Sequence, residues 1–284
     1  MRRKSKDLLM SNFVFSSRDK CGYPSDFGTG MPTISADRNQ RIAETLQHSM
    51  LQVLPTSKFP GLEVETFYEA AMHESDVGGD FFDAFALSER KVALVVGDVM
   101  GKGLIAAART TEVKYALRAF LHEYQAPEIA LAHLNNFICK THRLDDDSTE
   151  TFIVLALVVV DTAKGLVTLS SAGAEPTLVL RWNGTAEPVT LTGLPLGVQL
   201  GASYSVQSRL LSIGETVLMA TDGITEARRS RAFLGTEGFA ALAEKAGPTA
   251  SLRTLKETIC AGARAFAGGV MHDDACLLLA RHCG

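Results

Sequence analysis

The sequence predicts an α+β fold in which two β-sheets pack against each other and helices cover the outside. Along the chain come strand patterns, then two helical patterns together, then many strand patterns, and finally helices and a last strand. This segregation is typical of α+β folds, because α/β folds alternate the two kinds of element. Apolar residues make up 46% of the chain and charged residues 21%, which is ordinary globular usage and allows a sizeable core.

The beginning of the chain differs in pattern from the rest. Residues 1–33 mix Ser, Gly, Pro and charged residues without a period, which is typical of a poorly ordered tail. Residues 34–58 contain a helical pattern, with apolar side chains such as Ile42 and Leu46 at four-residue spacing. An amphipathic helix over residues 35–52 needs a partner surface. The two alternatives are its own domain and the same helix of a second copy in a homodimer.

The third region, residues 59–284, contains the strands and helices of the main domain. Strands are expected where apolar residues alternate or form short continuous runs: 62–67, 91–96, 152–160, 165–171, 177–182, 206–211, 216–220 and 275–280. Helices are expected over 104–124, 127–140, 239–245 and 252–266. Asn183-Gly184 directly after one strand is a strong signal for a tight hairpin turn.

Charge, hydropathy and cysteine content exclude several classes of protein. The 28 Lys and Arg residues against 32 Asp and Glu give a net charge of −4, so no basic excess is available for nucleic acid. The longest apolar run, residues 152–160, has nine residues and is too short to span a membrane. The five cysteines form no CxxC pair, and no apolar stretch follows the basic residues after Met1. We therefore expect a reducing, cytoplasmic location and no signal peptide.

Aspartates near the ends of apolar strands are the most informative feature. Asp98 and Asp222 each end an apolar run, and the pair Asp273-Asp274 precedes one. Asp80 follows two glycines. Turn formation is the simpler interpretation, because Asp-Gly is common in turns, but four carboxylate sites beside core strands favour a ligand role. Carboxylates without His or Cys suit Mg²⁺ or Mn²⁺, and two ions bridged by a carboxylate can activate a water and bind a phosphoryl oxygen.

Several short motifs occur in a specific order. They are Asp76-Val77-Gly78-Gly79-Asp80-Phe81-Phe82-Asp83, Gly97-Asp98-Val99-Met100-Gly101-Lys102-Gly103, Ala107-Ala108, Ser171-Ala172-Gly173, Leu194-Pro195-Leu196-Gly197, Ala220-Thr221-Asp222-Gly223-Ile224-Thr225-Glu226-Ala227 and Asp273-Asp274. In this order they resemble the PPM-type metal-dependent serine/threonine phosphatases, in the bacterial SpoIIE/RsbU branch. The resemblance covers residues 59–281, so 59–284 is the expected phosphatase domain. Residues 41–55 also resemble the linker helix that precedes this domain in RsbU-like proteins.

The resemblance implies an αββα sandwich of two antiparallel sheets, with a dinuclear Mn²⁺ or Mg²⁺ centre between them in each subunit. By position, Asp98 would bridge both ions as the catalytic carboxylate, and the carbonyl of Val99 would bind one of them. Asp80 would serve one ion, and Asp222 with Asp273 the other. A metal-bound water would attack a phosphoserine or phosphothreonine in one step, without a covalent phosphoenzyme.

Four further residues are candidates for supporting this centre or contacting the substrate: Gly79, Lys102, Asp274 and Arg228. Lys102 lies between two glycines at a helix start, where anions are favoured, although a solvated lysine is an equal alternative. Arg228 follows the Asp222 motif, where the family forms a flap near the substrate. The alternative for Arg228 is a solvated loop.

Three positions depart from the family pattern. Met100 stands where the eukaryotic members carry a histidine that can protonate the leaving group, so metal-bound water becomes the default proton source. Ala174 replaces the histidine of an AGH sequence that is frequent in the branch. Val154 replaces a frequent threonine, and we expect it to serve packing.

The function implied by the resemblance is a cytoplasmic, metal-dependent protein-serine/threonine phosphatase. Its expected substrate is a phosphorylated STAS-type anti-sigma factor antagonist in bacterial partner-switching regulation. Two alternatives are a pseudophosphatase that binds its partner without turnover and a hydrolase of small phosphate esters. The intact set of aspartates opposes the first alternative. Activity on a phosphoprotein, compared with activity on an aryl phosphate, tests the second.

Overall fold

The computed structural model describes residues 59–70, 78–144 and 152–284 of the chain. The predicted tail, 1–33, and the predicted linker helix, 34–58, lie outside these ranges. The pairing of residues 35–52 in a homodimer therefore stays a prediction.

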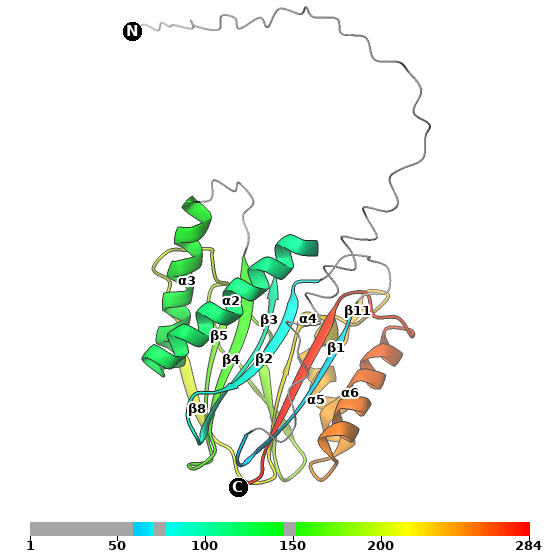
Figure 1. The fold of residues 1–284 in the computed structure, drawn as a ribbon. Coiled ribbons are helices and arrows are strands. Elements are labelled where there is room, and N and C mark those ends of the chain that lie inside the picture. Colours follow the sequence, from blue (N-terminus) through cyan, green and yellow to red (C-terminus); the bar gives the residue numbers. More distant parts are fainter. Residues whose placement is uncertain (1–58, 71–77, 145–151) are drawn as a thin grey trace, which may run out of the picture.

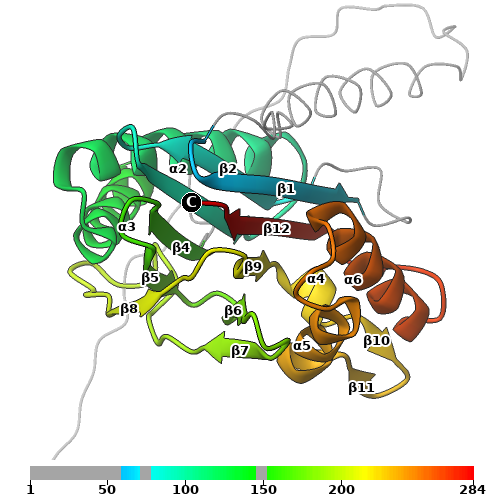
Figure 2. The same ribbon diagram turned by 90° about the horizontal axis from the view of Figure 1, so that it is seen from below.

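Two five-stranded sheets face each other and form the centre of the fold (Figures 1 and 2). The first sheet has the order β1 (Leu62–Glu69), β12 (Ala275–His282), β9 (Thr216–Ala220), β6 (Thr177–Leu180) and β7 (Ala186–Val189). The second has the order β2 (Asp80–Ala86), β3 (Lys91–Val99), β4 (Ile153–Asp161), β5 (Leu166–Ala172) and β8 (Val206–Leu210). Neighbouring strands pair antiparallel in both sheets.

Helices cover the outer face of each sheet (Figure 2). Against the second sheet lie α2 (Gly103–Tyr124) and α3 (Pro127–Leu144), and against the first lie α5 (Gly235–Ala246) and α6 (Leu252–Phe266). A short helix, α4 (Asp222–Thr225), and a small hairpin of β10 (Arg228–Arg229) and β11 (Ala232–Phe233) connect β9 to α5. These four layers confirm the predicted αββα sandwich. Within the described ranges, no helix combines the length and apolarity needed to cross a bilayer.

The central strands of the second sheet explain the continuous apolar runs of the sequence. In β3, the segment Val92–Val96 is fully buried, and β4 is buried over most of its length. Both strands have the other sheet on one face and helices on the opposite face, so no face of either strand meets water. A strand that is covered on both faces favours apolar residues at every sequence position rather than at alternate positions.

The strand β2 was not predicted from the sequence. Asp80 and Asp83 interrupt its apolar residues, and both are nevertheless buried, at 6% and 4% exposure. From the local sequence alone, such carboxylates are interpreted as turn or surface residues. They can be buried here because each has a polar partner from a distant segment, which the sequence pattern does not show.

The helix α2 is joined to β2 by polar contacts on one of its faces. The Lys114 Nζ donates to the carbonyl oxygen of Phe82 at 3.1 Å. One turn later, the Arg118 guanidinium donates two hydrogen bonds to the Asp83 carboxylate, at 2.7 and 2.8 Å. This paired geometry neutralises the buried Asp83 and fixes the helix against the strand that begins with Asp80.

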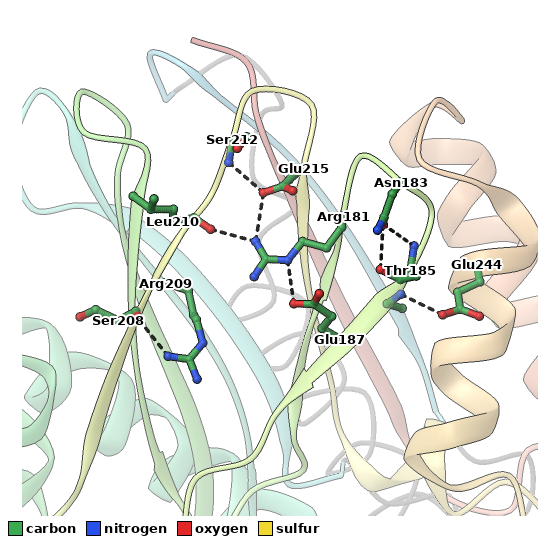
Figure 3. Close-up of polar contacts among 11 residues, drawn as sticks. Arg181, Asn183, Thr185, Glu187, Ser208, Arg209, Leu210, Ser212, Glu215 and Glu244 are labelled. Carbon is green, nitrogen blue, oxygen red and sulfur yellow. Dashed lines mark hydrogen bonds and ion pairs between the residues drawn. The ribbon is translucent and has the colours of Figure 1, made fainter.

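Arg181 joins the edges of the two sheets (Figure 3). It follows β6, and its Nη1 donates to the carbonyl oxygen of Leu210 in β8 at 2.9 Å. The same nitrogen donates to Glu215 Oε2 at 3.1 Å, and Nε donates to Glu187 Oε2 at 2.8 Å. Glu215 is only 3% exposed and also accepts from the backbone N–H of Ser212. The guanidinium therefore supplies the countercharge for a buried carboxylate between the sheets.

We predict that Arg181→Met destabilises the fold by about 2 kcal/mol, because it leaves the buried Glu215 carboxylate without its cation. Urea unfolding measures the change. Arg209→Met is the matched control, because Arg209 is exposed and its guanidinium donates to the neighbouring Gln207 side chain and Ser208 carbonyl oxygen. The control should change stability by less than about 0.5 kcal/mol. Equal losses in the two variants would contradict the role given to Arg181.

Candidate active site

Four aspartates from both sheets come together at one end of the sandwich. Asp80 begins β2 and lies directly opposite Asp98 of β3 in the antiparallel register. Asp222 begins α4 just after β9, and Asp273 lies just before β12, the strand paired with β9. Because β12 packs on β2 and β3, the two pairs of carboxylates face each other across the sandwich. Their charges act on one another, since, besides burial, Asp98 and Asp222 raise the pKa of Asp80, and Asp273 raises that of Asp98 and of Asp222.

Two glycines allow the backbone of the β2 segment to approach these carboxylates. A Cβ atom on Gly79 would lie 1.9 Å from the carbonyl oxygen of Val99 and 2.6 Å from Asp98 Oδ1. A Cβ atom on Gly78 would lie 1.3 Å from Asp274 Oδ2. Real atoms cannot approach so closely. A side chain at Gly79 would therefore displace the Val99 backbone, whereas one at Gly78 would make the Asp274 carboxylate turn away. The predicted supporting residues Gly79 and Asp274 are therefore part of the site's packing, with Asp274 buried at 7% exposure.

Asp80 is the most deeply buried of the four aspartates. It is 6% exposed, and its Oδ2 accepts a hydrogen bond from the Thr221 hydroxyl at 2.6 Å. Burial raises the pKa of Asp80 well above its usual value, and the neighbouring Asp98 raises it further. The Thr221 hydrogen bond acts in the opposite direction, because it stabilises the ionised carboxylate.

Asp98 and Asp222 are also held in a strongly negative environment. Burial raises the pKa of Asp98 to about 6, and the charges of Asp222 and Asp273 add to this effect. Burial likewise raises the pKa of Asp222 to about 6, with contributions from Asp273 and Glu226. At pH 7 these groups are mostly ionised, which costs folding free energy because both pKa values exceed those of an unfolded chain. A bound cation would offset this repulsion.

The donor set fits a hard divalent cation. It consists of carboxylate oxygens together with the backbone carbonyl of Val99, and Mg²⁺ and Mn²⁺ prefer oxygen ligands of this kind. In the part of the chain that the structure describes, no three His, Cys, Asp or Glu side chains lie close enough together to hold a metal ion as they stand. The coordination of two ions by Asp80, Asp98, Asp222 and Asp273 therefore stays a prediction.

The remaining candidates lie around this group of aspartates. Met100 follows β3, is 43% exposed, and its backbone N–H donates to the carbonyl oxygen of Phe152. Lys102 is exposed at the residue before α2, and Arg228 is exposed in the hairpin after α4. Val154 lies opposite Asp98 in the pairing of β3 with β4, in agreement with a packing role.

Sequence reasoning missed Thr221 as a functional residue. It stands directly before Asp222 in one of the motifs, but no local pattern shows that its hydroxyl meets Asp80, 141 residues away in the chain. The only available signal was a polar residue at the end of an otherwise apolar strand.

Comparison with known proteins identifies the family of the chain. The sequence profile of the family "Stage II sporulation protein E (SpoIIE)" matches residues 88–282. The chain therefore belongs to the SpoIIE family, which confirms the predicted resemblance.

Sequence relatives support the same assignment. "Phosphoserine phosphatase RsbU" of Bacillus subtilis is 24% identical over 231 residues, covering 81% of this chain and 67% of that protein. "Protein IcfG" of Synechocystis is 29% identical over 175 residues, covering 54% of this chain. The chain spans only 27% of the length of IcfG.

Solved structures share the fold. The SiaA-PP2C domain of Pseudomonas aeruginosa has a TM-score of 0.67 at 18% identity, covering 87% of this chain and 95% of that one. The RsbU and RsbW domains of Rv1364c from Mycobacterium tuberculosis give a TM-score of 0.64 at 29% identity, covering 81% of this chain and 61% of that one.

We predict that Asp98→Asn abolishes phosphatase activity and the rise in melting temperature that Mn²⁺ gives the wild-type chain. The substitution keeps the side-chain volume but removes the charge at the centre of the site. Without cation, the variant should be at least as stable as wild type at pH 7, because one repelling charge is gone. Thermal unfolding and phosphate release measure these effects, with Asp161→Asn, outside the site, as the control. Activity within a few-fold of wild type would remove Asp98 from the catalytic role.

Proposed function

We propose that this protein is a Mn²⁺- or Mg²⁺-dependent protein-serine/threonine phosphatase of the cytoplasm. The observation that carries the proposal is the meeting of Asp80, Asp98, Asp222 and Asp273 at one end of a PP2C-type fold. Membership of the SpoIIE family and similarity to the phosphoserine phosphatases RsbU and RsbP of Bacillus subtilis support it.

Two divalent cations per subunit fit the proposed chemistry. We infer that Asp98 binds both cations. Asp80 and the Val99 carbonyl would bind one cation, and Asp222 and Asp273 the other. When bound, such ions supply an activated water and neutralise charge on the phosphoryl group. A structural neighbour of the same fold, RsbX, has been solved in complex with magnesium, at 15% identity and a TM-score of 0.56.

The chain's own residues then position the substrate. Arg228 is exposed, three residues after the end of α4, and we infer that its guanidinium binds the phosphate dianion. Its neighbour Arg229 lies over the ring of Phe266, 5.0 Å from the centroid, and so the hairpin is held against α6. Lys102 precedes the first turn of α2, where backbone N–H groups favour an anion.

The surroundings of the site favour a protein substrate over a small ester. Met100, Phe152 and Leu194 are each more than 40% exposed. The backbone N–H of Met100 donates to the carbonyl oxygen of Phe152, and Leu194 lies two residues before Leu196, which pairs with Ile153. Exposed apolar side chains beside a polar site are typical of surfaces that bind proteins. We propose a phosphorylated STAS-type anti-sigma factor antagonist as the substrate, in a partner-switching pathway, on the basis of the resemblance to the SpoIIE/RsbU phosphatases.

Phosphate release from a phosphoserine-bearing STAS protein tests this function. We expect Mn²⁺-dependent release, with kcat/KM well above that for an aryl phosphate. Arg228→Gln should lower kcat/KM for the phosphoprotein by about tenfold, because a charge-assisted hydrogen bond is lost. Binding of the phosphoprotein without turnover would favour a pseudophosphatase. Equal activity on both substrates would favour a hydrolase of small phosphate esters.

We also predict that Met100→His raises turnover of a phosphoserine peptide more than that of an aryl phosphate. A serine alkoxide needs a proton to leave, whereas an aryl oxide leaves without one. The gain should be up to about tenfold, below the usual contribution of a well-placed acid. Ile105→His is the control, because Ile105 is 74% exposed at the start of α2. Equal changes on the two substrates would favour a metal-bound water as the proton source.

A further inference from the structure

Thr221 occupies a helix N-terminus but does not cap it. It is the N-cap residue of α4, with φ −83° and ψ 170°, and it is 5% exposed. A threonine at this position usually accepts a hydrogen bond from an N–H of the first helical turn. The Thr221 side chain makes no such bond. Its hydroxyl therefore forms hydrogen bonds with other groups.

The hydroxyl of Thr221 connects two strands of different sheets. The backbone N–H of Cys276 in β12 donates to Thr221 Oγ1 at 2.9 Å. Thr221 Oγ1 donates to Asp80 Oδ2 in β2 at 2.6 Å. The two bonds are compatible. A backbone N–H can only donate, so the hydroxyl accepts from Cys276, and its single hydrogen is available to donate to Asp80.

The backbone also fixes where this hydroxyl lies. The N–H of Thr221 donates to the carbonyl oxygen of Cys276 at 3.1 Å, one step beyond the last ladder pair of β9 and β12. Thr221 and Cys276 are therefore held together by two hydrogen bonds, one through the backbone and one through the side chain. A rigid donor of this kind restricts rotation of the Asp80 carboxylate and occupies one of its two oxygens.

We propose that Thr221 is a positioning residue for the metal ligand Asp80. Its hydroxyl holds Oδ2 of the carboxylate and leaves Oδ1 for the cation. The inference rests on the proposed function, because it takes Asp80 to be a ligand of Mn²⁺ or Mg²⁺. Hydrogen-bond partners of metal ligands commonly matter in this way, and their loss weakens metal binding by about 10- to 100-fold.

Titration of the full chain with Mn²⁺, followed by calorimetry and by the rise in melting temperature, tests the proposal. Thr221→Val keeps the shape but removes the hydroxyl, and we expect its Kd for Mn²⁺ to rise at least about tenfold. Thr221→Ser restores the hydroxyl and should return the Kd to within about threefold of wild type. At saturating Mn²⁺, the KM of Thr221→Val for an aryl phosphate should stay unchanged, because Thr221 does not contact the substrate.

Thr225→Val is the matched control. Thr225 is a buried threonine of the same short helix, but its hydroxyl faces the backbone carbonyl of Asp222 at 3.5 Å. Its Kd for Mn²⁺ should be that of wild type. Thr221→Ala, interpreted in the same way, replaces Thr221→Val if the latter does not fold.

Two results would overturn the inference while leaving the proposed function intact. One is an unchanged Mn²⁺ affinity in Thr221→Val, and the other is a Thr221→Ser variant as weak as Thr221→Val, which would indicate a purely packing role. A wild-type chain that binds neither Mn²⁺ nor Mg²⁺ would overturn both the inference and the proposed function.

Discussion

The burial of several carboxylates beside one another is the constraint on which the rest of this structure depends. Removing an ionised carboxylate from water is costly, and each neighbour of the same charge adds to the cost. Both effects are visible here, since burial and neighbouring aspartates raise the pKa of Asp98 and of Asp222 to about 6. The fold can contain such a site because its apolar core supplies stability elsewhere. The cations that we propose would supply the missing positive charge.

The site exists only where the two sheets meet. Asp80 and Asp98 come from adjacent strands of one sheet, whereas Asp222 and Asp273 flank adjacent strands of the other. The geometry of the site therefore follows the packing of sheet on sheet. Arg181 reinforces this packing through the buried Glu215. His282 of β12 does so as well, because its two ring nitrogens lie 2.8 and 3.1 Å from carbonyl oxygens of Leu211 and Thr162.

Close backbone approach links the packing to the chemistry. At Gly78 and Gly79 the space of a side chain is taken by Asp274 Oδ2 and by the Val99 carbonyl oxygen. An added methyl group at Gly79 would push the backbone of Val99 away from the β2 segment. At Gly78 it would displace the Asp274 carboxylate instead.

The sequence by itself determined the fold class and the central strands, and it singled out the aspartates that we propose as ligands. Strands β3 and β4 are covered on both faces, so their apolar runs are continuous and easily recognised, and the ordered motifs indicated the family. Only the tertiary structure decided that the segment around Asp80 and Asp83 is a buried strand and that Thr221 donates to Asp80. The reason is physical. A buried carboxylate depends on partners such as Arg118 and Thr221, which come from remote segments of the chain, and a local pattern of residues contains no information about them.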